Sequence, residues 1–131
     1  MAFNCIRQHG GKSRELINAT GAEIKKGQLI ALHSGEIISG ATAGAGDLLA
    51  TADADTANNA KGGFAIIDDT MEFEVDLKAE AETSIPAWTT FAVENDDLTV
   101  DSGAGFFVST EDVQPGASKV IGKFVEISTN L

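Results

Sequence analysis

The sequence has few of the residues that cross-link a chain or build an aromatic cleft. It contains one cysteine, Cys5, and no tyrosine among 131 residues. A lone cysteine cannot form a disulfide within the chain, so an apolar core or association of copies has to hold the fold together. With no tyrosine and a single tryptophan, Trp88, a cleft that stacks on sugar rings is hard to build.

Long apolar runs and basic residues are also scarce. No stretch approaches the roughly 20 apolar residues of a membrane-spanning helix, and the first eleven residues lack the apolar region of a signal peptide. The formal net charge is −11, from 20 acidic and 9 basic residues, and it would repel the phosphate backbone of DNA or RNA. We therefore expect no membrane partner, no nucleic-acid partner and synthesis in a reducing cytoplasm.

The charge is unevenly distributed along the chain. Residues 1–26 are net positive, although the chain as a whole is acidic. Their only acidic residues are Glu15 and Glu23, whereas five residues are basic: Arg7, Lys12, Arg14, Lys25 and Lys26. Such asymmetry is typical of a basic segment that meets an acidic partner or an acidic neighbouring copy, and it is equally compatible with simple solubility.

The first residues combine apolar side chains with a glycine pair. Phe3, Cys5 and Ile6 precede Gly10-Gly11 near the chain end. They are few for a core, so we predict a flexible N-terminal arm at residues 1–13 and a single β-rich domain at 14–131. Removing the arm is then expected to leave the domain folded but to weaken its attachment to a partner.

Short apolar strands separated by turn residues make up most of the chain. Apolar and charged residues alternate strictly over 71–78, which is the period of a strand with one buried face. The other segments with strand composition are 27–33, 64–68, 88–93, 105–110 and 119–127, and residues 14–39 read as hairpin material with a corner at Ser34-Gly35. This pattern predicts an all-β, single-domain fold without a fixed-period internal repeat.

Residues 39–61 differ from the rest because Ala, Gly, Asp, Thr and Asn dominate them. Leu48 and Leu49 are their only bulky apolar residues. We predict an Ala/Gly-rich loop here, with a short helix after Asp47 as the alternative. The stretches 96–103 and 114–117 are predicted to be turns.

The best candidate for a metal site is the acidic stretch that contains Asp53 and Asp55, followed by Asn58 and Asn59. Calcium prefers such oxygen ligands. An EF-hand loop opening at Asp53 needs glycine at position 58 and a carboxylate at position 64, and the latter is Phe64. We therefore interpret the stretch as a solvated loop and expect no metal.

Candidates for catalysis are equally sparse. Cys5 and His9 are the only close nucleophile and base, and they lie on the predicted arm, without rigid support. With His33 they remain too few for a tetrahedral zinc site. The stretch 74–79 resembles the lysine-bearing hairpin of lipoyl-carrier domains, but Leu77 separates Asp76 from Lys78. We expect neither an enzyme nor a cofactor.

Trp88 allows two interpretations. A tryptophan beside Pro86 is most often a core anchor, and it is alternatively an interface residue of the kind that dominates binding energies. The sequence-based candidates for partner binding are Phe3, Ile6, Arg7, Lys12 and Trp88.

The order of segments resembles the capsid decoration, or cement, proteins of tailed bacteriophages. The resemblance covers most of the chain and rests on an N-terminal arm followed by the pieces AEIKKGQLIAL (22–32), GGFAIIDD (62–69), FEVDL (73–77), IPAWTTFAVEND (85–96) and KVIGKFVEI (119–127). It implies a β-barrel or β-tulip-like domain that assembles as a homotrimer. Its place would be the outer surface of an expanded phage head in the virion, where it clamps neighbouring major capsid subunits without catalytic residues. The alternative is a small soluble ligand-binding or carrier β-barrel, and a third hypothesis is a small hydrolase that uses acidic residues.

Overall fold

A computed structural model describes residues 3–7, 12–68, 70–94 and 98–125. Its strands are β1 Asn4–Arg7, β2 Lys12–Ile17, β3 Leu29–His33, β4 Glu36–Ser39, β5 Leu48–Ala52, β6 Lys61–Ile66, β7 Glu72–Leu77, β8 Thr90–Val93, β9 Thr99–Ser102, β10 Phe107–Ser109 and β11 Lys119–Phe124. The helical element η1, Gly40–Thr42, is a single 3-10 turn. In the described ranges no helix has the length and apolarity to cross a membrane. The predicted all-β, single-domain fold is confirmed.

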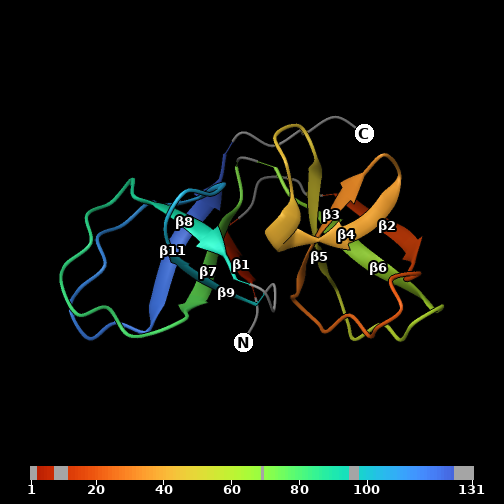
Figure 1. The fold of residues 1–131 in the computed structure, drawn as a ribbon, viewed down its shortest axis with the longest axis horizontal. Coiled ribbons are helices and arrows are strands. Elements are labelled where there is room, and N and C mark those ends of the chain that lie inside the picture. Colours follow the sequence, from red (N-terminus) through yellow and green to blue (C-terminus); the bar gives the residue numbers. More distant parts are fainter. Residues whose placement is uncertain (1–2, 8–11, 69, 95–97, 126–131) are drawn as a thin grey trace.

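The strands form two sheets that lie side by side (Figure 1). One sheet has the order β2-β6-β5-β3-β4 and is antiparallel throughout. The other has the order β1-β7-β11-β10-β8-β9. A parallel pairing of β7 with β9 closes its five strands β7 to β11 into a barrel, so β1 lies outside the closed ring on the edge of β7.

The two sheets have the same topology. We call residues 12–66 the first half and residues 72–124 the second half. Strands β2 to β6 of the first half are arranged in the same order as β7 to β11 of the second. In each half, the loop before the second strand also makes one antiparallel bridge to the loop before the last strand. The bridges are Ile24 to Thr56 and Ile85 to Val113.

The backbone hydrogen bonds next to these bridges are equivalent too. The amide of Gly27 donates to the carbonyl of Ala52 at 2.8 Å, and that of Trp88 donates to Ser109 at 2.7 Å. Because the intervals between equivalent residues differ, no fixed sequence period exists. The prediction of no fixed-period repeat therefore overlooked a duplication of topology.

Each bridge residue is followed three positions later by a residue with positive φ. These residues are Gly27 (φ 78°), Asn59 (67°), Trp88 (69°) and Gly116 (84°). The chain thus makes the same tight turn four times, and each turn leads into a strand. Glycine and asparagine tolerate this left-handed conformation, whereas tryptophan rarely adopts it.

The core is continuous across the two halves. Five phenylalanines of the closed barrel and the strand on its edge pack edge-to-face or tilted, with ring centroids 5.1–6.5 Å apart: Phe3, Phe73, Phe91, Phe107 and Phe124. Leu29, Ala31 and Leu49 of the first half belong to the same buried cluster. A smaller cluster around Phe64 fills the first half alone.

The prediction of a flexible arm is wrong for the described residues 3–7. Strand β1 pairs antiparallel with β7, and the amide of Phe3 donates to the carbonyl of Gly27 at 3.0 Å. The Phe3 side chain is 3% exposed and contacts three other core phenylalanines. Phe3 therefore belongs to the core, and removal of this segment is expected to destabilise the fold.

Two predicted loops contain strands. Residues 39–61 include η1 and β5, and Leu49, Ala50 and Ala52 on β5 are buried. Small side chains suit this central strand, which neighbours β3 and β6 closely. Residues 99–102, predicted to be a turn, form β9, because its pairing with β7 and β8 compensates for its polar composition.

Candidate functional site: an open seam and an exposed tryptophan

The first half lacks the strand pairing that closes the second. In the second half β7 pairs directly with β9, at Asp76 to Thr99 and Leu77 to Val100. In the first half the equivalent strands β2 and β4 are the two ends of the sheet order, and neither pairs with another described strand along its outer edge. We call the space between β2 and β4 the seam.

A groove of about 580 Å³ occupies the seam. It is lined by the end of β2, the start of β4 and the turns next to them: Glu15, Leu16, Ile17, Ala19, Leu32, Gly35, Glu36, Ile37 and Lys61. Leu16, Leu32 and Ile37 pack on the first-half core cluster, and Ile17 is 58% exposed. The groove therefore combines an apolar floor with two exposed strand edges, which is the surface that accepts an added strand.

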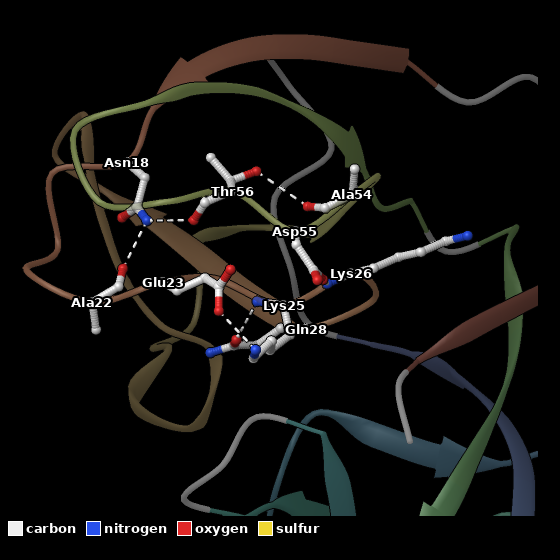
Figure 2. A network of polar contacts seen from close by, with 9 residues as sticks. All are labelled: Asn18, Ala22, Glu23, Lys25, Lys26, Gln28, Ala54, Asp55 and Thr56. Carbon is white, nitrogen blue, oxygen red and sulfur yellow. Dashed lines mark hydrogen bonds and ion pairs between the residues drawn. The ribbon is translucent and has the colours of Figure 1, made fainter.

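Asn18 fixes the end of β2 beside this groove (Figure 2). It is fully buried, and its Nδ2 donates to the carbonyl oxygens of Ala22 at 2.7 Å and Thr56 at 3.0 Å. Its Oδ1 accepts from the amide and the hydroxyl of Thr20, at 3.1 and 2.6 Å. The carboxamide is thus fully satisfied, so β2 ends at a rigid point.

Asn18 has a much smaller counterpart in the second half. The backbone of Asn18 bonds to Asn59 and Ala60, and the backbone of Ala81 bonds in the same way to Gly116 and Ala117. The side chain of Asn18 therefore supports a loop for which the second half needs only an alanine.

The acidic stretch considered for metal binding serves the same loops. The Asp55 carboxylate accepts from the amide of Lys26 at 2.7 Å (Figure 2). The Asn58 side chain accepts from the amide of Gly21 at 2.9 Å. In the ranges that the structure describes, no group of three or more His, Cys, Asp or Glu residues is placed to hold a metal ion. These oxygens stabilise turns.

Trp88 is the most exposed large apolar side chain described, at 65%. Its backbone is left-handed and is held by the hydrogen bond to Ser109, while the Ala87 amide donates to Asp112 at 2.8 Å. The Lys123 ammonium lies 5.9 Å from the ring centroid. A left-handed conformation costs a non-glycine residue roughly 1–2 kcal/mol, so this tryptophan is presented to solvent at an energetic cost.

The structure separates the sequence-based candidate residues. Phe3 is in the core, which overturns its assignment to partner binding, whereas Ile6 on β1 is 39% exposed. Arg7 and Lys12 lie on β1 and β2, and their side chains are outside the description. Trp88 precedes β8, and β8 pairs with neither β1 nor β2.

The seam residues were missed by the sequence analysis. Leu16 and Ile17 are adjacent, so their side chains point to opposite faces of β2, and one of them has to lie away from the core. That break in alternation was the available signal. The absence of a β2–β4 pairing depends on contacts between residues far apart in the sequence and left no local trace.

Ion pairs on the surface shift the pKa values of a few groups. The hydrogen bond from the Gly44 amide, followed by that from His33 at 2.8 Å, lowers the pKa of Asp47. The hydrogen bond to Glu94, at 2.9 Å, raises the pKa of Lys78. Lys78 is therefore engaged at the end of β7 rather than presented at a hairpin tip, as a carrier lysine would be.

Cys5 is exposed on β1, and His9, with which it was considered for catalysis, lies outside the described residues. No protein-family model matches the chain, and no curated protein has a significantly similar sequence.

Proposed function

We propose that this protein is a non-enzymatic structural protein that binds the outer surface of a phage head and stabilises the capsid by clamping neighbouring major capsid subunits. The proposal begins from the order of segments in the sequence. It includes assembly as a homotrimer on the virion surface.

The observation that carries the proposal is the presentation of Trp88. Three equivalent turns place Gly27, Asn59 and Gly116 at this position, and one places a largely exposed tryptophan there. Tryptophan is enriched at the energetic centre of protein interfaces because it buries a large rigid area. A strained, exposed tryptophan on a stiff barrel suits an anchor that docks without rearranging.

A rigid body also supports a clamping role. The buried cluster spans both halves, so a force applied at one half is transmitted to the other through packed side chains. Exposed apolar side chains lie on different parts of the molecule, Trp88 on the second half and Ile17 on the first, as expected for a protein that touches more than one neighbour.

Cosedimentation with purified expanded phage heads tests the proposal. We expect stoichiometric binding of the full chain and at least about tenfold weaker binding of Trp88→Ala, since truncating an anchor costs 1.4 kcal/mol or more. Asn59→Gly, at another of the four left-handed turns, is the control and should bind normally. Absence of binding by the full chain would refute the function, and equal binding of Trp88→Ala would refute the anchor. Light scattering over a concentration range tests the homotrimer.

The groove in the seam favours one second candidate, a small ligand-binding or carrier β-barrel. Its volume lies within the range of small-molecule sites, and Glu15, Glu36 and Lys61 supply polar groups around its apolar floor. Native mass spectrometry of the purified protein distinguishes the two functions. A stoichiometric copurified molecule, or an adduct on Lys78, would support the second candidate over the first.

A further inference from the structure

We propose that Ser109 and Asp112 are positioning residues that hold Trp88 in its left-handed, exposed conformation before a partner binds, so that the side chain docks without rearrangement. Both act through the backbone of residues 86–89, which we call the Trp88 turn. The inference rests on the proposed function, because it names the residues that prepare its anchor. Its first test uses the free protein and requires no phage head.

All three backbone amides of the Trp88 turn donate to acceptors outside it. The amide of Ala87 donates to the Asp112 carboxylate at 2.8 Å. The amide of Trp88 donates to the carbonyl of Ser109 at 2.7 Å, and that of Thr89 donates to the Ser109 hydroxyl at 3.2 Å. Ser109 is fully buried on β10, so these bonds tie the turn to the wall of the closed barrel.

The equivalent turn of the first half has the carboxylate bond but not the buried hydroxyl. There Asp55 accepts from the amide of Lys26 at 2.7 Å, so this bond is common to both halves. Ala52 occupies the position of Ser109, since its carbonyl accepts from the amide of Gly27. Alanine has no hydroxyl, so the bond from the serine side chain to the turn is confined to the half that carries the tryptophan.

A second difference stiffens the same turn. Pro86 directly follows the bridge residue Ile85, where the first half has Lys25. The proline ring fixes its own φ at about −65°. Its carbonyl also accepts from the hydroxyl of Thr89 at 2.7 Å. This difference and the one at Ser109 both restrict the turn that presents the exposed side chain.

Restraint matters here because tryptophan resists the conformation that this position requires. Trp88 has a φ of 69°, and only a few per cent of non-glycine residues have a positive φ. Its counterpart Gly27 adopts such a conformation readily. Without the bonds, Trp88 would relax to negative φ and redirect its ring. The apparent affinity for a partner then falls with the fraction of molecules that remain in the competent conformation.

The first test measures the backbone conformation of Trp88 in the free protein by NMR. A positive φ brings the amide and α protons of one residue close together, so Trp88 should show a strong intraresidue nuclear Overhauser effect. Combining Ser109→Ala with Asp112→Ala should weaken it at least about twofold, as the residue samples negative φ. Asp112→Asn keeps the acceptor oxygen and should preserve the effect.

Asp55→Ala is the matched control, because it breaks the equivalent carboxylate bond in the first half and should leave the Trp88 signal unchanged. Contacts between β7 and β9 in the same spectra report that the barrel is folded. If the double variant loses these contacts, Ser109→Ala alone carries the measurements. An unchanged Trp88 signal in the folded variant would overturn the proposal.

The second test is cosedimentation with expanded phage heads. A folded variant in which Trp88 has relaxed should bind at least about threefold more weakly than the parent chain, and Asp112→Asn should bind normally. Equal binding of the relaxed variant would overturn the positioning role. Absence of binding by the parent chain would instead refute the proposed function, and the NMR comparison would then decide by itself whether the two residues hold the turn.

Discussion

The two halves of the molecule share one strand order, but only the second half closes into a barrel. The second half closes by pairing β7 with β9 and is filled by five phenylalanines. The first half stops short of closure at β2 and β4, and the buried side chains of its own cluster are mostly smaller. The comparison shows that strand order alone does not determine closure. The difference lies between the first and third strands of each half, which pair in the second half and do not pair in the first.

The two halves also differ in the residues at their left-handed turns. The first half uses Gly27 and Asn59 at its left-handed positions, which carry little strain, while the second half uses Gly116 and the strained Trp88. The open edge and the exposed tryptophan are thus on different halves, so substitutions can separate what each half contributes.

The largest expected effect comes from the phenylalanine cores. Phe124→Ala in the second half and Phe64→Ala in the first should each lower the free energy of unfolding by about 3–5 kcal/mol, because both side chains are fully buried. Since one cluster spans both halves, each variant should unfold in a single transition. Denaturant titration followed by circular dichroism and by Trp88 fluorescence checks this, and non-coincident transitions would show that the halves unfold separately.

Phe3 should behave as a residue of the second-half core. Phe3→Ala is expected to cost about 3 kcal/mol, whereas Ile6→Ala on the adjacent strand β1 should cost less than about 1 kcal/mol, because Ile6 is 39% exposed. Thermal unfolding of the two variants measures the difference. Equal, small effects would restore the idea of a dispensable arm.

Asn18 has no polar counterpart in the second half, so its substitution removes contacts that only the first half makes. Asn18→Ala leaves the carbonyl of Thr56 without this donor and should cost about 2 kcal/mol. Thr20→Val removes the hydroxyl contacts to Asn18 and Ala22 at an exposed position and should cost less. Chemical denaturation gives both values, and Asn18→Ala as stable as the parent chain would mean that water replaces the network.

Much of the fold was predictable, but only where the information is local. The strict alternation at 71–78 and the corner at Ser34-Gly35 predicted β7 and the β3–β4 hairpin. Strand β5 was missed because its small residues suit a tightly flanked central strand and also resemble a loop. The duplication was missed because its four turns share a backbone conformation and not a residue type.

The candidate site was predictable only in part. Trp88 was recognised as a residue with an interface alternative, and its exposure agrees with that alternative. Phe3 was misassigned because β1 gains its stability from pairing with β7, which is distant in the sequence. The seam exists because β2 and β4 do not pair, and no local sequence pattern predicts that two distant strands stay unpaired.

Relief of strain at the turns should give a smaller effect. Trp88→Gly is expected to be about 1 kcal/mol more stable than Trp88→Ala, because only glycine removes the left-handed penalty. Gly116→Ala, whose added methyl group would meet nothing within 4 Å, should cost a similar amount. Comparing midpoints of denaturation checks both, and a Trp88→Ala variant as stable as Trp88→Gly would rule out strain.

The smallest effect concerns the surface charge pair of the first half. The pKa of Asp47 is lowered from its ordinary value of 3.8 by the Gly44 amide and by His33. The stabilisation is therefore present above pH 3.8 and is lost as pH falls through the lower, folded-state pKa. Carboxyl chemical shifts followed by NMR titration should give a midpoint below 3.8, and His33→Ala should move it upward. An unchanged midpoint would exclude the contribution of His33.

The most direct test of the contrast between the halves is a map of backbone nuclear Overhauser contacts in the full chain. It should contain contacts that link Asp76 and Leu77 on β7 to Thr99 and Val100 on β9. It should contain none that link Glu15–Ile17 on β2 directly to Glu36–Ile38 on β4. Direct backbone contacts between β2 and β4 would contradict the account, because the first half would then be a closed barrel like the second.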